Sequence, residues 1–165
     1  MASDAKDVRA LLVREARTVA RRDGSRSIEA EHVLLALAAT RTTSAARTTS
    51  AARMLAEAGL TEETIRTALD REWEQSLAVA GVAVRIGLLP EATPDESRDP
   101  HIGDSTKLLL KRAMDTGTGR LGPLRILVGI LDTERGRVAR ALQAAGVDRA
   151  ALRARAAEAL AAGDH

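Results

Sequence analysis

Residues 28–37 read IEAEHVLLAL, and this stretch decides the fold. The chain is densely apolar from His32 to Ala39, just beyond the end of this stretch, which is typical of a helix buried on most of its surface. Glu29 and Glu31 lie near its start, where carboxylates stabilise the positive end of a helix. Ser27 is the expected N-cap. The stretch therefore predicts a buried helix that begins after Ser27.

The same pattern recurs 93 residues later, where residues 126–130 (ILVGI) match residues 33–37 (VLLAL). Further along the chain the spacing is 87 residues, because ARML at 52–55 matches ARAL at 139–142. Self-similarity at such a spacing indicates that two copies of one supersecondary unit pack together. The two halves of the chain are therefore expected to share one architecture.

A tandem duplication accounts for the change of spacing. Residues 41–46 read RTTSAA, and residues 47–52 read the same again. Its Thr and Ser side chains favour local hydrogen bonds to the backbone over helix formation, which indicates a surface connection.

Apolar residues at three- and four-residue spacing predict four helices in each half. In the first half, the first helix runs from Asp4 to Arg22, the third ends at Gly59 and the fourth starts at Thr61. Repeated prolines then interrupt the chain. We expect an all-α, eight-helix bundle of two pseudo-twofold four-helix repeats. The first repeat is 1–80, the linker 81–104 and the second repeat 105–165, together forming one compact domain.

Composition excludes several classes of function. The chain has no cysteine, so disulfides and thiolate chemistry are excluded. Its formal net charge is only +2 over 165 residues, which gives no reason to expect nucleic acid as a partner. The N-terminus has no apolar signal region and no window is apolar enough to cross a membrane, so we expect a cytoplasmic protein.

No motif predicts a catalytic residue, a cofactor or a metal. The chain has no G-x-x-x-x-G-K-[ST] loop, and its histidines His32, His101 and His165 lack the spacing of a metal site. Residues 117–122 (GTGRLG) fit the dinucleotide pattern G-x-G-x-x-G. The pattern follows a predicted helix instead of a strand, so we interpret it as a structural turn.

The stretch at 28–37 resembles the I-x-x-E-H-L-L-L-A-L signature of the N-terminal repeat domain of Clp-type protein unfoldases. ARML at 52–55, followed by Gly59 and Leu60, is similar to the second signature of that family. Residues 125–130 and 139–147 repeat both signatures in degraded form. The resemblance implies recognition of protein substrates, adaptors or small-molecule ligands of a Clp protease system, without the unfoldase activity itself.

The resemblance also implies candidate binding residues. Some family members use the Glu of the E-H signature to engage phosphorylated arginine, which makes Glu31 and the adjacent His32 the candidates for binding substrate or phosphoarginine. In the second half the equivalent positions are Leu124 and Arg125, so only one such site is expected. A first-turn Glu can also simply stabilise its helix, and a buried histidine is more often a packing or capping residue.

Three functions stay open at this point. The first is an adaptor, competitor or decoy of a Clp system that binds segments in a groove between the halves, where the first helix and the linker meet. The second is a helical regulatory or nucleic-acid-associated protein, which only the pI near 9.6 and the arginine content favour. The third is an enzyme. The apolar segment 82–89 either binds a partner or folds back over the bundle, and we expect the latter. The oligomeric state is open.

Overall fold

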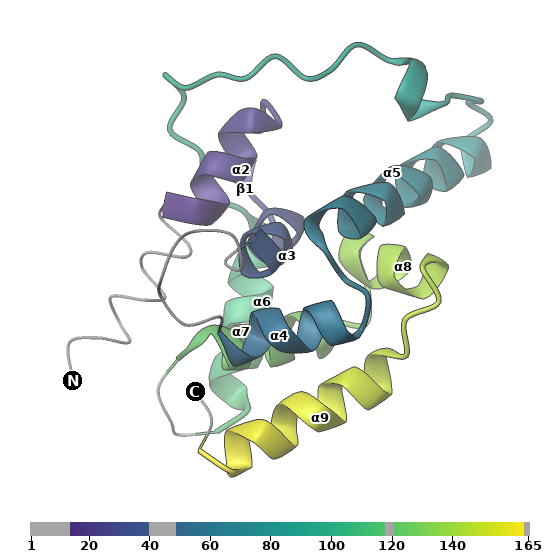
Figure 1. Cartoon of the computed structure of the whole chain (residues 1–165). Helices are drawn as coiled ribbons and strands as arrows, with labels where there is room; N and C mark the ends of the chain where they lie inside the picture. The colour runs from purple at the N-terminus through teal and green to yellow at the C-terminus, as the bar shows by residue number, and fades with distance from the viewer. Residues whose placement is uncertain (1–13, 40–48, 118–120, 164–165) are drawn as a thin grey trace.

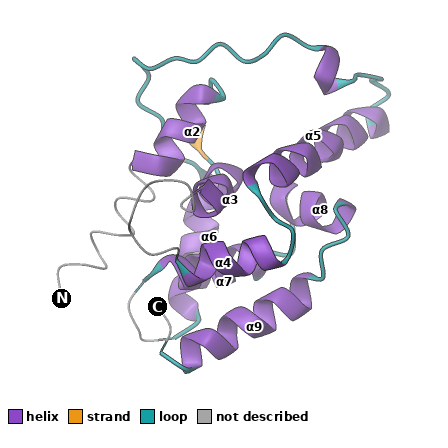
Figure 2. Ribbon diagram, in the orientation of Figure 1, coloured by secondary structure: helices purple, strands orange, loops and turns teal. Residues whose placement is uncertain are grey.

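A computed structural model describes residues 14–39, 49–117 and 121–163. Within these residues the protein is all-α, with eight α-helices, one short 3-10 helix and two two-residue strands (Figures 1 and 2). The duplicated loop at 41–46, most of the predicted helix from Asp4, and residues 118–120 of the glycine-rich turn lie outside the described residues.

The helices of the first half follow one another closely. They are α2 (Ala16–Arg22), α3 (Ala30–Ala39), α4 (Ser50–Glu57) and α5 (Glu62–Val79). Gly59 has a φ of 74°, the left-handed conformation that ends a helix at little steric cost, which confirms the predicted end of the third helix. Thr61 caps α5 as predicted, since its side chain accepts a hydrogen bond from Thr64 N–H.

The second half contains α6 (Asp104–Asp115), α7 (Pro123–Leu131), α8 (Arg137–Ala144) and α9 (Arg149–Ala161). Between α5 and α6 the chain forms only the 3-10 helix η2 (Ile86–Leu88) and the strand β2 (His101–Ile102). The turn that contains Gly117 joins α6 to α7, so a helix and not a strand precedes the G-x-G-x-x-G pattern.

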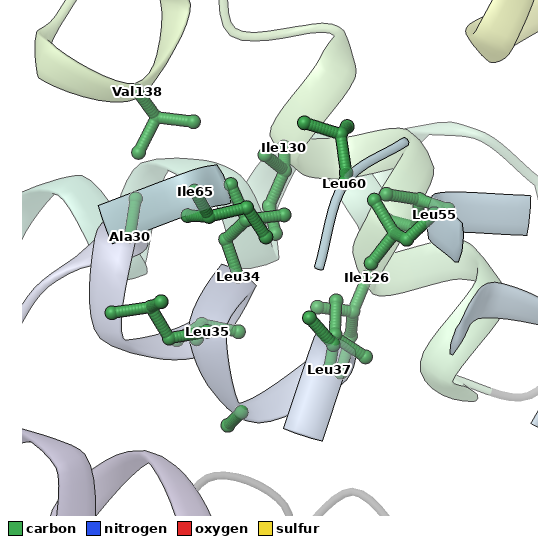
Figure 3. Close-up of a cluster of buried hydrophobic side chains, with 14 of the residues drawn as sticks. Ala30, Leu34, Leu35, Leu37, Leu55, Leu60, Ile65, Ile126, Ile130 and Val138 are labelled. Carbon is green, nitrogen blue, oxygen red and sulfur yellow. The ribbon is translucent and has the colours of Figure 1, made fainter. Parts of the chain in front are cut away.

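Helices α3 and α7 form the centre of the fold. Eight of the ten residues of α3 and eight of the nine residues of α7 are buried. Leu34 and Leu37 of α3 lie beside Ile126 and Ile130 of α7, with Leu55 from α4 against them (Figure 3). Burial of such side chains contributes about 1.5–3 kcal/mol each, so this cluster carries much of the stability. The densely apolar stretch from His32 to Ala39 correctly predicted that α3 is buried.

Ser27 does not cap α3, contrary to the sequence prediction. It lies in the strand β1 (Ser27–Ile28), which pairs in parallel with β2. The segment before α6 thus returns to the start of α3, and the N-termini of these two helices lie together. Glu29 fixes this contact, because its carboxylate accepts hydrogen bonds from Ser105 and from the Ser27 hydroxyl.

Ser105 completes the contact by accepting a hydrogen bond from Ala30 N–H at 2.8 Å. Burial acts to raise the pKa of Glu29, but the hydrogen bonds from Ser105 and Ser27 outweigh it and hold that pKa below its usual value. A Cβ on Gly103 would lie 1.9 Å from Glu29 Oε1, so any larger residue there would displace the Glu29 carboxylate from its present position. The start of α3 is therefore held in place by residues far away in the sequence.

Candidate functional site

A cleft of about 520 Å³ lies where α5, the start of α3 and the segment after α5 meet. Its apolar wall includes Leu35, Leu69 and Trp73. Its charged wall consists of Asp23, Glu31, Arg66, Asp70 and Arg137. The cleft joins both halves of the chain, because Arg137 comes from the first turn of α8.

Glu31 lies in this cleft and is paired. Its side chain is 14% exposed, and its Oε1 accepts a hydrogen bond from Nη1 of Arg137 at 3.1 Å. The guanidinium of Arg137 also lies over the ring of Trp73, 5.6 Å from its centroid, at a distance that permits cation–π attraction. A hydrogen-bond acceptor and a planar cation are thus adjacent at the cleft surface.

A buried carboxylate holds Arg137 from the other side. Glu72 of α5 is only 2% exposed, and its Oε2 lies 3.6 Å from Nε of Arg137. Its Oε1 accepts hydrogen bonds from Arg140 Nε and from the Ser76 hydroxyl, both at 2.7 Å. The geometry of Arg137 is therefore fixed by a charge in the interior, which gives the cleft a preformed cation.

His32 is a capping residue. It is 5% exposed, and its Nδ1 accepts a hydrogen bond from the backbone N–H of Glu29 at 2.8 Å. This contact satisfies a donor at the start of α3, the role that Glu or Gln has in a capping box. With Nδ1 as acceptor, the neutral ring carries its proton on Nε2, which lies 3.8 Å from Asp23 Oδ2. Its placement agrees with the structural interpretation of this residue.

Burial dominates the electrostatics of His32. It lowers the pKa of His32 and outweighs the attraction of the nearby carboxylates Glu31, Asp23 and Glu29, while Arg137 acts in the same direction as burial. The ring is therefore neutral at pH 7. His32 lines the cleft, and its Nδ1 is occupied by the backbone N–H of Glu29.

A second ion pair lies on the other side of the cleft. Arg66 donates from Nη1 to Asp23 Oδ1 at 3.1 Å, and its Nε donates to Glu62 at 3.3 Å. Both arginines of the cleft are thus matched by carboxylates. The side chain of Asp70, one turn after Arg66 on α5, makes no hydrogen bond or ion pair within the part of the chain that the structure describes. Burial raises its pKa, and the attraction of Arg137 and Arg66 only partly offsets this.

Residues 80–100 form a strap that runs from the end of α5 back towards α2 (Figure 1). Near α5 it is held by Glu74, which accepts a hydrogen bond from Ile86 N–H at 2.7 Å. Near α2 it is held by Arg21, whose Nε donates to the carbonyl of Arg98, and by Arg98, which donates to the carbonyl of Gly24. Ile86 and Leu89 line the cleft between these anchors.

The apolar part of the strap does not cover the bundle, contrary to our expectation. Leu88 is 82% exposed and Leu89 is 51% exposed. The strap is held by backbone and charged contacts at its ends, so its apolar side chains are left beside the cleft. They add an exposed apolar rim to a charged site.

The second half has no equivalent carboxylate site. Leu124 is fully buried, and Arg125 donates to the carbonyls of Met114 and Gly117 at the end of α6. This arginine therefore has a structural role at a helix C-terminus.

Sequence reasoning selected Glu31 and His32, which lie together in the cleft, but missed Arg137, Glu72 and Asp70. One signal for Glu72 was available. It follows Ile65, Ala68 and Leu69 on the buried face of α5, and a carboxylate on an apolar face requires a partner. No local pattern marks Arg137, because its partners are distant in the sequence.

The described residues contain no group of three or more His, Asp or Glu side chains that could hold a metal ion. Among them there is likewise no helix long and apolar enough to cross a membrane. The chain matches no protein-family model and no curated protein. The fold and the site define an all-α protein with a charged, apolar-rimmed cleft.

Proposed function

We propose that this protein is a non-catalytic recognition module similar to the N-terminal domains of Clp unfoldases. It binds protein substrates or adaptors of a Clp protease system in the cleft that contains Glu31. The observation that carries the proposal is the position of Glu31. The one carboxylate that matches the family signature lies in a cleft of about 520 Å³, against a preformed arginine and beside an exposed apolar rim.

We also propose that the fold is a pseudo-twofold pair of four-helix repeats. Two turns support this. After α4, Leu60 N–H donates to Leu55 O and Gly59 N–H to Ala56 O. After α8, Val147 N–H donates to Leu142 O and Gly146 N–H to Gln143 O, each position 87 residues later. Both turns have the two hydrogen bonds of a Schellman motif, at positions that the internal repeat aligns.

The pair of Glu31 and Arg137 suits a phosphorylated arginine. A phosphoguanidine carries N–H donors next to an anionic phosphoryl group. Glu31 can accept hydrogen bonds from the N–H donors while Arg137 pairs with the phosphoryl group. A bound phosphoarginine would therefore replace the ion pair between Glu31 and Arg137 by two charge-assisted contacts. Arginine-phosphorylated proteins are therefore the first ligands to test, and one working site is expected because Leu124 stands at the second position.

Binding in the cleft allows three modes of action, which are delivery, competition and sequestration of the bound molecule. We propose that the protein acts as an adaptor, as a competitor or as a decoy for molecules that target a full-length unfoldase. The nucleic-acid alternative gains no support from the cleft, since Arg66 and Arg137 are both held by carboxylates. A binding signal that falls steeply with salt concentration would favour it again.

Affinity capture from a lysate that contains a Clp system tests the proposal. The wild-type protein should recover Clp subunits or their clients, and Glu31→Ala should lose them. Glu158→Ala is the matched control, since Glu158 is exposed on α9 and contributes nothing to the cleft. Recovery of neither Clp subunits nor clients by the wild-type protein would contradict all three roles.

A further inference from the structure

The charges of the cleft do not balance. Its carboxylates are Asp23, Glu31 and Asp70, and its cations are Arg66 and Arg137. The side chain of His32 is neutral because burial lowers its pKa. Asp23 pairs with Arg66 and Glu31 pairs with Arg137, which leaves Asp70 as the one carboxylate of the cleft without an ion-pair partner among the described residues.

Asp70 stands where a ligand could reach it. It lies on α5 one turn after Arg66 and one turn before Trp73, so the three side chains share one face of the helix. Asp70 is exposed and lines the cleft together with the apolar Ile86 and Leu89 of the strap. A ligand that enters here meets the Asp70 carboxylate in a cleft whose lining also includes the apolar side chains of Trp73, Ile86 and Leu89.

These observations specify the chemistry of the occupant. We propose that the cleft takes a positively charged side chain, presented by an apolar segment of a partner protein, and that Asp70 pairs with it. The charge of the segment compensates Asp70, and its apolar neighbours cover Trp73, Leu89 and the exposed Leu88. This deepens the proposed function, on which it rests, by assigning a class of unmodified segments to the same cleft.

A cation at Asp70 and a phosphoarginine at Glu31 make opposite electrostatic demands. Asp70 attracts an unmodified arginine and repels a phosphoryl group. Removal of the Asp70 charge therefore weakens the binding of an unmodified arginine and does not weaken the binding of phosphoarginine. This difference in sign separates the two modes of binding within one cleft.

Trp73 provides a direct readout. It is the only aromatic side chain in the chain apart from histidine, since there is no Tyr and no Phe, so the intrinsic fluorescence comes entirely from the cleft. The full-length protein would be titrated with three end-blocked pentapeptides of sequence Ala-Leu-X-Leu-Ala. X is arginine, its uncharged analogue citrulline, or phosphoarginine.

The arginine peptide should bind at least about tenfold more tightly than the citrulline peptide, a factor that a desolvated ion pair readily supplies. Asp70→Asn should reduce the affinity for arginine to that for citrulline and leave the affinity for phosphoarginine undiminished. Asp115→Asn, an exposed position at the end of α6, is the matched control and should change neither. Circular dichroism checks that the variants keep their helices.

Three outcomes distinguish this inference from the proposed function. Equal affinity for the arginine and citrulline peptides would overturn the inference, whatever phosphoarginine does. Binding of the arginine peptide that survives Asp70→Asn would also overturn it. The absence of phosphoarginine binding, with the arginine peptide still bound through Asp70, would remove the phosphoarginine part of the proposed function and leave the inference intact.

Discussion

Arg137 donates a hydrogen bond to Glu31 at 3.1 Å, although 106 residues separate the two in the sequence. Nε of the same guanidinium lies 3.6 Å from Oε2 of the buried Glu72, and the guanidinium lies over the ring of Trp73, 5.6 Å from its centroid. One side chain from the first turn of α8 therefore connects the start of α3 to the middle of α5. This relationship positions the acidic candidate residue and closes one side of the cleft.

The buried carboxylate of Glu72 predicts a non-additive pair of substitutions. Arg140→Ala leaves Arg137 beside Glu72, and Arg137→Ala leaves Arg140, so each single change should cost about 1 kcal/mol of unfolding free energy. The double variant leaves a carboxylate that is 2% exposed without a cation, and we expect a loss of about 3 kcal/mol or more. Urea unfolding of the four proteins measures the coupling. Additive costs would show that the two arginines do not share Glu72.

His32 predicts a pH dependence of stability. Its folded pKa lies below the ordinary value of 6.5, so the unfolded chain binds the proton more readily than the folded one. Stability should be constant above about pH 6.5 and should decrease as the pH falls from there towards the folded pKa. Denaturant unfolding between pH 7.5 and pH 5.5 measures the slope, before most carboxylates titrate.

His32→Gln is the informative variant for this slope. Glutamine at the same position can still accept from Glu29 N–H, as in a capping box, but it does not titrate. The variant should therefore keep most of the stability at pH 7.5 and lose the decrease below pH 6.5. His101→Gln, at an exposed position in β2, should keep the slope of the wild-type protein. An unchanged slope in His32→Gln would assign the dependence to another group.

Gly129 predicts a close packing constraint between α6 and α7. A Cβ there would lie 2.4 Å from the carbonyl oxygen of Leu109 and 2.9 Å from Cβ of Ala113. Gly129→Ala should cost about 2 kcal/mol or more, although the same change at an exposed helical site would stabilise by about 1 kcal/mol. The midpoint of urea unfolding measures this loss of stability. Gly87→Ala meets nothing within 4 Å and should be nearly neutral, so equal effects at both sites would contradict the packing.

The sequence predicted the helices well because helix formation depends on local patterns. Apolar spacing, the cap at Thr61 and the left-handed Gly59 all act within a few residues, and the structure has each of them. Ser27 was misassigned because it lies in β1, and local patterns do not specify the pairing of β1 with the distant strand β2. A two-residue strand also carries too little signal to be recognised in a linker.

The candidate site was predicted only in part, for the same reason. Glu31 and His32 were found because their motif is continuous in the sequence. The partners that give them their properties come from α8 and from the middle of α5, and charge pairs of this kind form only once the helices pack. The strap was expected to cover the bundle. Its contacts are instead made by Arg21, Arg98 and Glu74, which leaves its leucines exposed.

The most direct test of the central claim is calorimetric titration of the purified protein with an arginine-phosphorylated protein and with free phosphoarginine. We predict saturable binding at one site, abolished by Glu31→Ala and retained in Glu158→Ala. Glu31→Ala should cost at most about 1 kcal/mol of stability, so a loss of binding would reflect recognition and not unfolding. Heat of binding that is identical in the wild-type protein and in Glu31→Ala, or no binding to either ligand, would contradict the assignment of Glu31 as the recognition residue.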